Sequence, residues 1–173
     1  SCRIYRIAVP YSRAEIERAC EDVVRENAFA ECYIRPLVLL GYNGTSLGVD
    51  PAGFPTTVAI AAYAWGRYLG PDAIEKGVRA RVSSWTRIAP NTLPTLAKTA
   101  ANYMNSQLIK IEAREGGFDE GIALDASGRV SEGSGENIFL IYRGELYTPP
   151  LSSSVLPGIT RDTVMVLARD LGI

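Results

Sequence analysis

The stretch GIALDASGRVSEGSGEN, residues 121–137, carries the clearest structural signal in the chain. Residues 121–124 and 129–132 have strand-forming composition, and the turn signal Asp125-Ala126-Ser127-Gly128 between them predicts a β-hairpin. The second strand ends on Glu132, and the glycines that follow allow a ligand to approach the backbone closely. The alternative is a glycine-rich turn whose carboxylates are solvated. Glu132 is therefore the first candidate for a binding or catalytic acid.

Helical and strand patterns alternate on both sides of this hairpin. A helical pattern from about residue 100 to Glu115 is stopped by Gly116-Gly117. Near the N-terminus, the capping-box pattern Ser12-Arg13-Ala14-Glu15 begins a helix with one apolar stripe. The predicted helices are 13–26, 100–115 and 160–170, and the predicted strands are 31–40, 56–65, 77–85, 121–124, 129–132, 137–142 and 145–148. This mixed order predicts an α/β or α+β class.

A break in these patterns at residues 66–71 predicts a domain boundary. The chain has 173 residues, a length that permits one large domain or two small ones with enough apolar material to form a core. We expect residues 1–65 to belong to a small N-terminal α/β domain, 66–72 to form an interdomain connector, and 73–173 to belong to a large C-terminal domain.

Composition excludes several function classes. With 18 Lys+Arg against 19 Asp+Glu, the formal net charge is -1, which disfavours binding to nucleic acid or to an anionic membrane. The chain has no histidine, so His-based catalysis and His-ligated metal are excluded, and we expect no metal site. The longest apolar runs, such as Val58–Trp65, are far shorter than the roughly 18 residues that a membrane span needs. Three cysteines without metal-ligand or C-x-x-C spacing indicate reduced thiols and favour a cytoplasmic location.

Lys98 is the candidate nucleophile. It lies in the stretch 94–101, and it is the only charged residue between Arg87 and Lys110. A lysine in such a segment can be partly desolvated, which favours the neutral, nucleophilic amine. The alternative is an exposed lysine at the start of a helix, and this segment taken alone favours that alternative.

Two further segments offer binding groups. Residues 156–161 place a glycine and Thr160 at the start of a helix, where free N–H groups bind phosphate readily; the alternative is an ordinary N-cap by Thr160. On the strand 31–40, Tyr33 and Arg35 face the same way and offer a hydroxyl donor and a bidentate clamp for a carboxylate. Alone, these two are more typical of a surface pair. A nucleophilic lysine, an acid, a phosphate cradle and a carboxylate clamp together fit one cofactor, pyridoxal phosphate.

Eight blocks of sequence, taken in chain order, closely resemble the branched-chain amino-acid aminotransferases of fold-type IV, which are class IV pyridoxal-phosphate-dependent enzymes. The resemblance runs from end to end of the chain, and eight ordered blocks are far more specific than any single motif. The blocks are residues 33–37, 83–85, 89–95, 97–98, 102–103, 120–125, 131–137 and 156–161. The resemblance implies a two-domain fold-type IV architecture, with part of the small domain and most of the large, cofactor-binding domain.

The resemblance also implies roles for individual residues. Lys98 would bind pyridoxal 5'-phosphate covalently and would move the proton between the substrate α-carbon and the cofactor. Glu132 would keep the pyridine nitrogen protonated, and Tyr103 would donate a hydrogen bond to the phenolate oxygen of the cofactor. The phosphate would be held from the helix N-terminus by Gly158, Ile159 and Thr160.

For the substrates, the resemblance implies amino-group exchange between branched-chain L-amino acids (Leu, Ile, Val) and 2-oxoglutarate. Tyr33 would help to hold the α-carboxylate, Arg35 would receive the distal carboxylate of glutamate, and Tyr68 would line the side-chain pocket. A guanidinium at the rim of apolar walls can serve both kinds of side chain, because it pairs with a carboxylate and otherwise remains hydrated. We expect a homodimer or a larger homo-oligomer, and no nucleic-acid or membrane partner.

Members of the family are longer than this chain. The resemblance therefore implies that the chain begins inside the small domain and ends inside the large one, without the N-terminal phosphate-binding arginine and the C-terminal Ser-Gly-Thr turn. Such a chain alone would retain the cofactor weakly and show little activity. The alternatives are a D-amino-acid or R-selective amine aminotransferase, an aminodeoxychorismate lyase of the same fold, or a catalytically silent assembly module.

Overall fold

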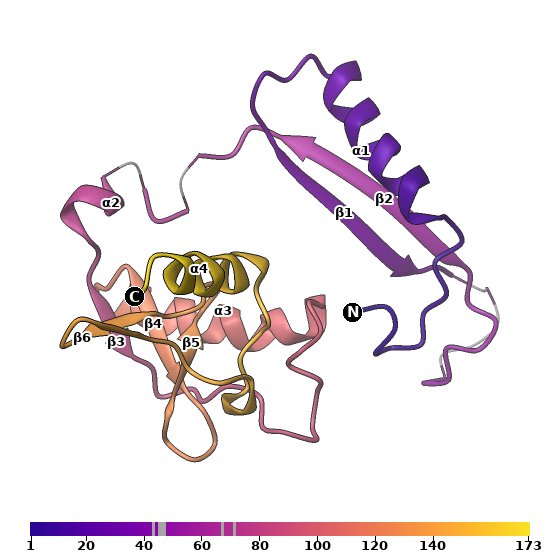
Figure 1. The fold of residues 1–173 in the computed structure, drawn as a ribbon. Helices are drawn as coiled ribbons and strands as arrows, with labels where there is room; N and C mark the ends of the chain where they lie inside the picture. The colour runs from indigo at the N-terminus through magenta and orange to yellow at the C-terminus, as the bar shows by residue number, and fades with distance from the viewer. Residues whose placement is uncertain (43, 45–47, 67, 71) are drawn as a thin grey trace. The chain divides into compact units, whose positions relative to one another are not determined.

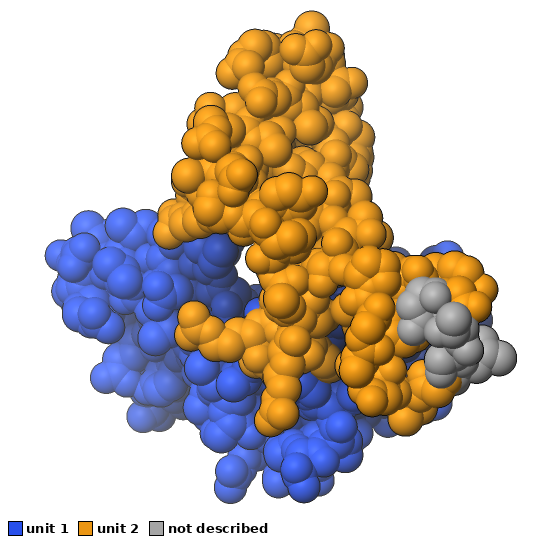
Figure 2. Space-filling view, turned by 90° about the vertical axis from the view of Figure 1, so that its right-hand side faces the viewer, with its two compact units in different colours: residues 1, 72–173 blue, residues 2–71 orange. Residues whose placement is uncertain are grey.

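The computed structural model describes residues 1–42, 44, 48–66, 68–70 and 72–173. The chain divides into two compact units, Cys2–Pro71 and Asp72–Ile173, with Ser1 grouped with the second (Figure 2). The predicted connector at 66–72 contains the point of division, although residues 67 and 71 lie outside the described residues. The assignment of these parts to a small and a large domain remains a prediction.

The unit Cys2–Pro71 combines one helix with a two-stranded sheet (Figure 1). Helix α1, Arg13–Glu26, begins with the predicted capping box, in which Ser12 and Glu15 cap each other's backbone N–H groups. Strands β1, Tyr33–Leu40, and β2, Thr56–Tyr63, pair antiparallel, and α1 contacts both. Pro36 is tolerated in β1 because a strand of a two-stranded sheet has a free edge.

The second unit is built on the predicted hairpin. Strand β4, Glu120–Leu124, pairs antiparallel with β5, Val130–Gly133, and parallel with β3, Ala80–Val82. A parallel pair requires a crossover connection, and helix α3, Ala100–Glu115, lies in that connection and contacts β4. The remaining elements are α2, Ala73–Lys76; β6, Leu140–Tyr142; β7, Glu145–Tyr147; the short 3-10 helix Leu151–Ser153; and α4, Ile159–Asp170.

Most predicted elements are present, but several strands are shorter than expected. Strand β3 ends at Val82 and not at residue 85, because Glu112 of α3 accepts a hydrogen bond from the Ser83 hydroxyl and one from the Ser84 N–H (3.0 Å). The bonds to Glu112 end regular pairing at Ser84, while the Ser83 N–H still donates to the Ile122 carbonyl oxygen of β4 at 2.8 Å. The short helices α2 and Leu151–Ser153 were not predicted, because each is too short for a periodic apolar pattern.

The interface between α3 and β4 depends on Gly121. The core at this point contains Ile109 of α3 and Ala123 of β4, both fully buried. A Cβ atom at position 121 would lie 2.6 Å from Cγ2 of Ile109 and 2.9 Å from its carbonyl oxygen. Glycine therefore allows α3 to approach the sheet closely.

Gly121→Ala is expected to lower the free energy of unfolding by about 1–3 kcal/mol, as overpacking of a dense core does. Urea unfolding measures this change. Gly66→Ala is the control, because a Cβ at position 66 meets no other described residue within 4 Å, its chain neighbours aside. An unfolding free energy for Gly121→Ala equal to that of the unchanged protein would contradict the close approach.

The sequence predicts neither a membrane span nor a metal site, and the described residues bear on both predictions. Within the part of the chain that the structure describes, none of the helices has the length and apolar character that crossing a membrane requires. In the same residues no group of three or more His, Cys, Asp or Glu side chains is arranged to hold a metal ion. The three cysteines are free thiols, and the cytoplasmic location remains a prediction.

Candidate active site

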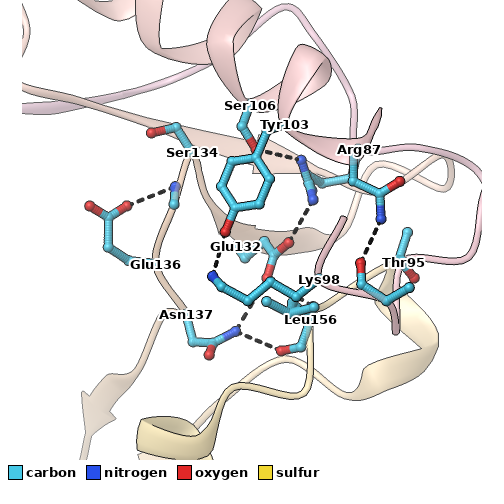
Figure 3. Close-up of a pocket in the computed structure, with 13 residues that line it drawn as sticks. Arg87, Thr95, Lys98, Tyr103, Ser106, Glu132, Ser134, Glu136, Asn137 and Leu156 are labelled. Carbon is cyan, nitrogen blue, oxygen red and sulfur yellow. Dashed lines mark hydrogen bonds and ion pairs between the residues drawn. The ribbon is translucent and has the colours of Figure 1, made fainter. Parts of the chain in front are cut away.

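Lys98 immediately precedes Thr99, the N-cap residue of α3. Its Nζ donates a hydrogen bond of 2.6 Å to the Tyr103 hydroxyl, one turn into the helix (Figure 3). Lys98 is exposed, as the alternative favoured by its segment taken alone predicts. The other two lysines are engaged by carboxylates: Lys76 Nζ lies 2.6 Å from Asp72, and Lys110 Nζ lies 2.7 Å from Glu120. Lys98 instead presents its amine beside a phenol.

Glu132 is a buried acid at the end of β5. It is only 5% exposed, which excludes the alternative of a solvated carboxylate. Its Oε1 lies 2.9 Å from Nη2 of Arg87 in an ion pair whose side chains are both almost inaccessible. Its Oε2 accepts hydrogen bonds from the Leu156 N–H at 3.0 Å and from Nδ2 of Asn137 at 3.2 Å (Figure 3). Three donors therefore fix the position of this carboxylate.

The charges around Glu132 set its protonation. Burial raises the pKa of the Glu132 carboxyl, while Arg87, the Leu156 N–H and the more distant Lys98 act to lower it. A carboxylate has about four lone-pair positions, and three are used by the donors described above. Glu132 thus keeps room for one further donor, such as a protonated ring nitrogen.

The N-terminus of α4 provides a site for an anion. The N-cap residue is Gly158, and among the described side chains none caps this end of the helix. The alternative in which Thr160 serves as the N-cap is therefore wrong, because Thr160 lies inside the first turn. Uncapped N–H groups at a helix start carry partial positive charge and bind phosphate.

Lys98 belongs to two adjoining pockets. One contains Tyr103, Glu132 and Arg87, and the other contains Gly158, Ile159 and Thr160. The residues common to both are Lys98, Gly135, Glu136, Asn137 and Leu156. The structure therefore brings together the amine, the acid and the helix N-terminus that the sequence indicated.

Another partly buried acid, Glu136, also lines both pockets. Burial, together with the charge of Glu120, raises the pKa of the Glu136 carboxyl. One of its oxygens accepts a hydrogen bond of 3.0 Å from the Gly135 N–H. Glu136 is thus a weaker acid than an exposed glutamate.

The predicted substrate residues lie in the unit Cys2–Pro71. Tyr33 packs against Trp65 with ring centroids 4.8 Å apart, and the Arg35 guanidinium lies 5.1 Å from the Tyr33 centroid and 5.5 Å from that of Trp65. Tyr68 is half exposed. The role of all three predicted residues in the site remains a prediction.

Two site residues, Arg87 and Asn137, were not identified as such from the sequence. Arg87 is 6% exposed, and its Nη1 also donates to Oδ1 of Asn105 at 2.7 Å. The available signal is that Arg87 lies alone in an uncharged stretch, which is compatible with burial. A buried cation needs an acid partner, so an ion pair with a buried carboxylate follows. Asn137 carries no signal of its own within the block 131–137, and its contacts depend on the loop at Leu156.

The family model described as "Amino-transferase class IV" matches residues 1–173. The chain belongs to this family. Among curated relatives, the branched-chain-amino-acid aminotransferase of Escherichia coli (strain K12) is 53% identical over 174 residues, covering 100% of this chain and 56% of that protein. The relative of the same description from Pseudomonas aeruginosa is 45% identical over 172 residues, covering 99% of this chain and 55% of that protein. The chain thus spans just over half the length of these relatives.

Solved structures agree with this assignment. A crystal structure of the Escherichia coli branched-chain amino acid aminotransferase superposes with a TM-score of 0.95 at 53% identity, covering 99% of this chain and 56% of that one. The branched-chain amino acid aminotransferase from Thermobaculum terrenum, solved in its PLP-form, superposes with a TM-score of 0.86 at 35% identity, covering 98% of this chain and 54% of that one. The predicted family resemblance and fold class are confirmed.

Proposed function

We propose that the protein to which this chain belongs, called the natural protein below, is a pyridoxal-phosphate-dependent aminotransferase. It would exchange amino groups between branched-chain L-amino acids and 2-oxoglutarate. The observation that carries the proposal is the position of Lys98, which lines both the pocket of the buried Glu132 and the pocket at the uncapped N-terminus of α4. The family assignment and the names of the relatives support the same activity.

The residues fit the cofactor at three points. The Lys98 amine suits its aldehyde, the remaining lone-pair position of Glu132 suits its ring nitrogen, and the α4 N-terminus suits its phosphate. Solved relatives in the PLP-form or with pyridoxamine 5'-phosphate support the same assignment. When bound, the cofactor supplies an electron sink for the bonds of the substrate α-carbon.

In this proposal, the chain's own residues hold and move protons. The Lys98 amine would act as a general base that takes the proton from the substrate α-carbon. It would then act as a general acid that gives a proton to the cofactor. The Tyr103 hydroxyl, within 2.6 Å of Nζ in this structure, orients the amine. Glu132, kept in place by Arg87, holds a proton at the ring nitrogen.

For substrate selection we propose the roles predicted for Tyr33, Arg35 and Tyr68. The Arg35 guanidinium lies against the rings of Tyr33 and Trp65, an arrangement typical of cation–π contact. Such a guanidinium can pair with the distal carboxylate of glutamate beside an apolar wall that suits leucine, isoleucine or valine. A homodimer or larger homo-oligomer belongs to the same proposal.

Activity assays of the natural protein test the reaction. Transfer of the amino group from L-leucine, L-isoleucine or L-valine to 2-oxoglutarate is expected. Preference for D-alanine or an R-amine, or conversion of aminodeoxychorismate, would indicate the alternatives of the same fold. No turnover of any of these compounds by a folded protein would favour the silent assembly module.

A further inference from the structure

Asn137 links the acid end of the site to the phosphate end. Its Nδ2 donates to Oε2 of Glu132 at 3.2 Å and to the Leu156 carbonyl oxygen at 3.0 Å. The Leu156 N–H donates to the same Oε2 at 3.0 Å, so the three groups form a closed ring of hydrogen bonds (Figure 3). Because both partners of Nδ2 are acceptors, the orientation of the amide is defined by its contacts.

The other side of the Asn137 amide faces Gly158. A Cβ atom at position 158 would lie 2.2 Å from Oδ1 of Asn137 and 3.4 Å from its Cγ. The backbone at Gly158, with φ -66 and ψ 138, is accessible to every residue type, so space and not backbone conformation requires glycine here. Gly158 is the N-cap residue of α4, and Asn137 therefore contacts the start of the proposed phosphate site directly.

We propose that Asn137 is a positioning residue that sets the separation between Glu132 and the N-terminus of α4, and thereby matches the site to the distance between ring nitrogen and phosphate in the cofactor. This inference rests on the proposed function. Asn137 holds the carboxylate with Nδ2 and limits the approach of Gly158 with Oδ1. A ligand that contacts both Glu132 and the N-terminus of α4 gains affinity from this fixed spacing. Once one contact is made, the other forms within the same complex.

The test compares ligands that use one end or both ends of the site. Asn137→Ala is expected to weaken binding of pyridoxal 5'-phosphate by about tenfold or more, because the two ends of the site are then no longer held at the spacing that lets one ligand use both. Binding of pyridoxal, which lacks the phosphate, is expected to change by about twofold at most, and so is binding of inorganic phosphate. Absorbance titration measures the two aldehydes, and calorimetry measures phosphate.

A second variant keeps the test independent of folding defects. Gly158→Ala alone is expected to lower the melting temperature and to weaken binding of pyridoxal 5'-phosphate, because the new Cβ meets Oδ1 of Asn137. In the Asn137→Ala background that oxygen is absent, so the same substitution is expected to have little additional effect on either quantity.

The outcomes separate the inference from the proposed function. Equal weakening of pyridoxal and pyridoxal 5'-phosphate, unchanged affinity for both, or additive effects of the two substitutions would each overturn the inference alone. Failure of the unchanged natural protein to bind pyridoxal 5'-phosphate would overturn the proposed function and the inference with it.

Discussion

Replacing Arg87 with alanine is expected to lower the free energy of unfolding by about 3–5 kcal/mol, the range measured when one partner of a buried ion pair is removed. Arg87 and Glu132 are both almost inaccessible, and their charged groups lie 2.9 Å apart. Without the guanidinium, the Glu132 carboxylate remains buried and loses its ion-pair partner among the described residues, and Asn105 loses its donor. Denaturant unfolding at neutral pH measures the loss.

The loss for Arg87→Ala is expected to depend on pH. Burial raises the pKa of the Glu132 carboxyl above its value in the unfolded state, so the folded state binds the proton more tightly. This contribution to stability is present at low pH and is lost as pH rises and the carboxyl ionises. Removing Arg87 raises this pKa further. The variant is therefore expected to approach the stability of the unchanged protein as pH falls and Glu132 is protonated. The same loss at neutral and acidic pH would contradict the role assigned to the charge.

Arg81→Ala is the matched control for Arg87→Ala. Arg81 pairs with Glu112 at 3.3 Å in the same unit, but its side chain is 35% exposed. Water can solvate that pair after one partner is removed, so a much smaller loss is expected. A second check is Glu132→Gln in the Arg87→Ala background, which is expected to recover part of the stability because it removes the unpaired charge.

Lys98→Ala is expected to remove the visible absorbance of the bound cofactor and to lower the rate of transamination on the order of 10⁴-fold, the upper range for loss of a general acid–base group. Lys98 is exposed, so its removal leaves the packing intact, and without cofactor the variant is expected to melt close to the temperature of the cofactor-free unchanged protein. Absorbance spectra and single-turnover rates measure the two effects.

Two further variants distinguish the chemistry of Lys98 from its charge. Lys98→Arg keeps a cation but cannot bind the aldehyde covalently, and is expected to behave like Lys98→Ala. Lys76→Ala removes a lysine whose side chain is 73% exposed and paired with Asp72, and is expected to leave the spectrum unchanged. A visible band that survives in Lys98→Arg would remove Lys98 from its proposed role.

The groups that meet the cofactor could be predicted because each has a local signal. Glu132 lies next to the last residue of β5 in a glycine-containing segment, and the glycine before Ile159 is the N-cap of a helix, so local sequence indicates both groups. The α1, α3 and α4 boundaries were close to prediction because capping residues and apolar spacing act within a few turns. Local sequence signals were therefore sufficient to predict Glu132 and the N-terminus of α4.

The supporting residues could not be predicted in the same way. Arg87 pairs with Glu132 across 45 positions of sequence (132 − 87), and Asn137 contacts Leu156 across 19 positions (156 − 137), so neither contact leaves a local pattern. Tertiary contacts decide both burial and partners.

Borohydride reduction of the natural protein with bound pyridoxal 5'-phosphate, followed by peptide mass mapping, tests the central claim most directly. Reduction makes the link between cofactor and amine permanent, and the chain has three lysines to compare: Lys76, Lys98 and Lys110. We predict a phosphopyridoxyl group on the peptide that contains Lys98 and on neither of the others. The modification on Lys76 or Lys110, or on no lysine of this chain, would contradict the account.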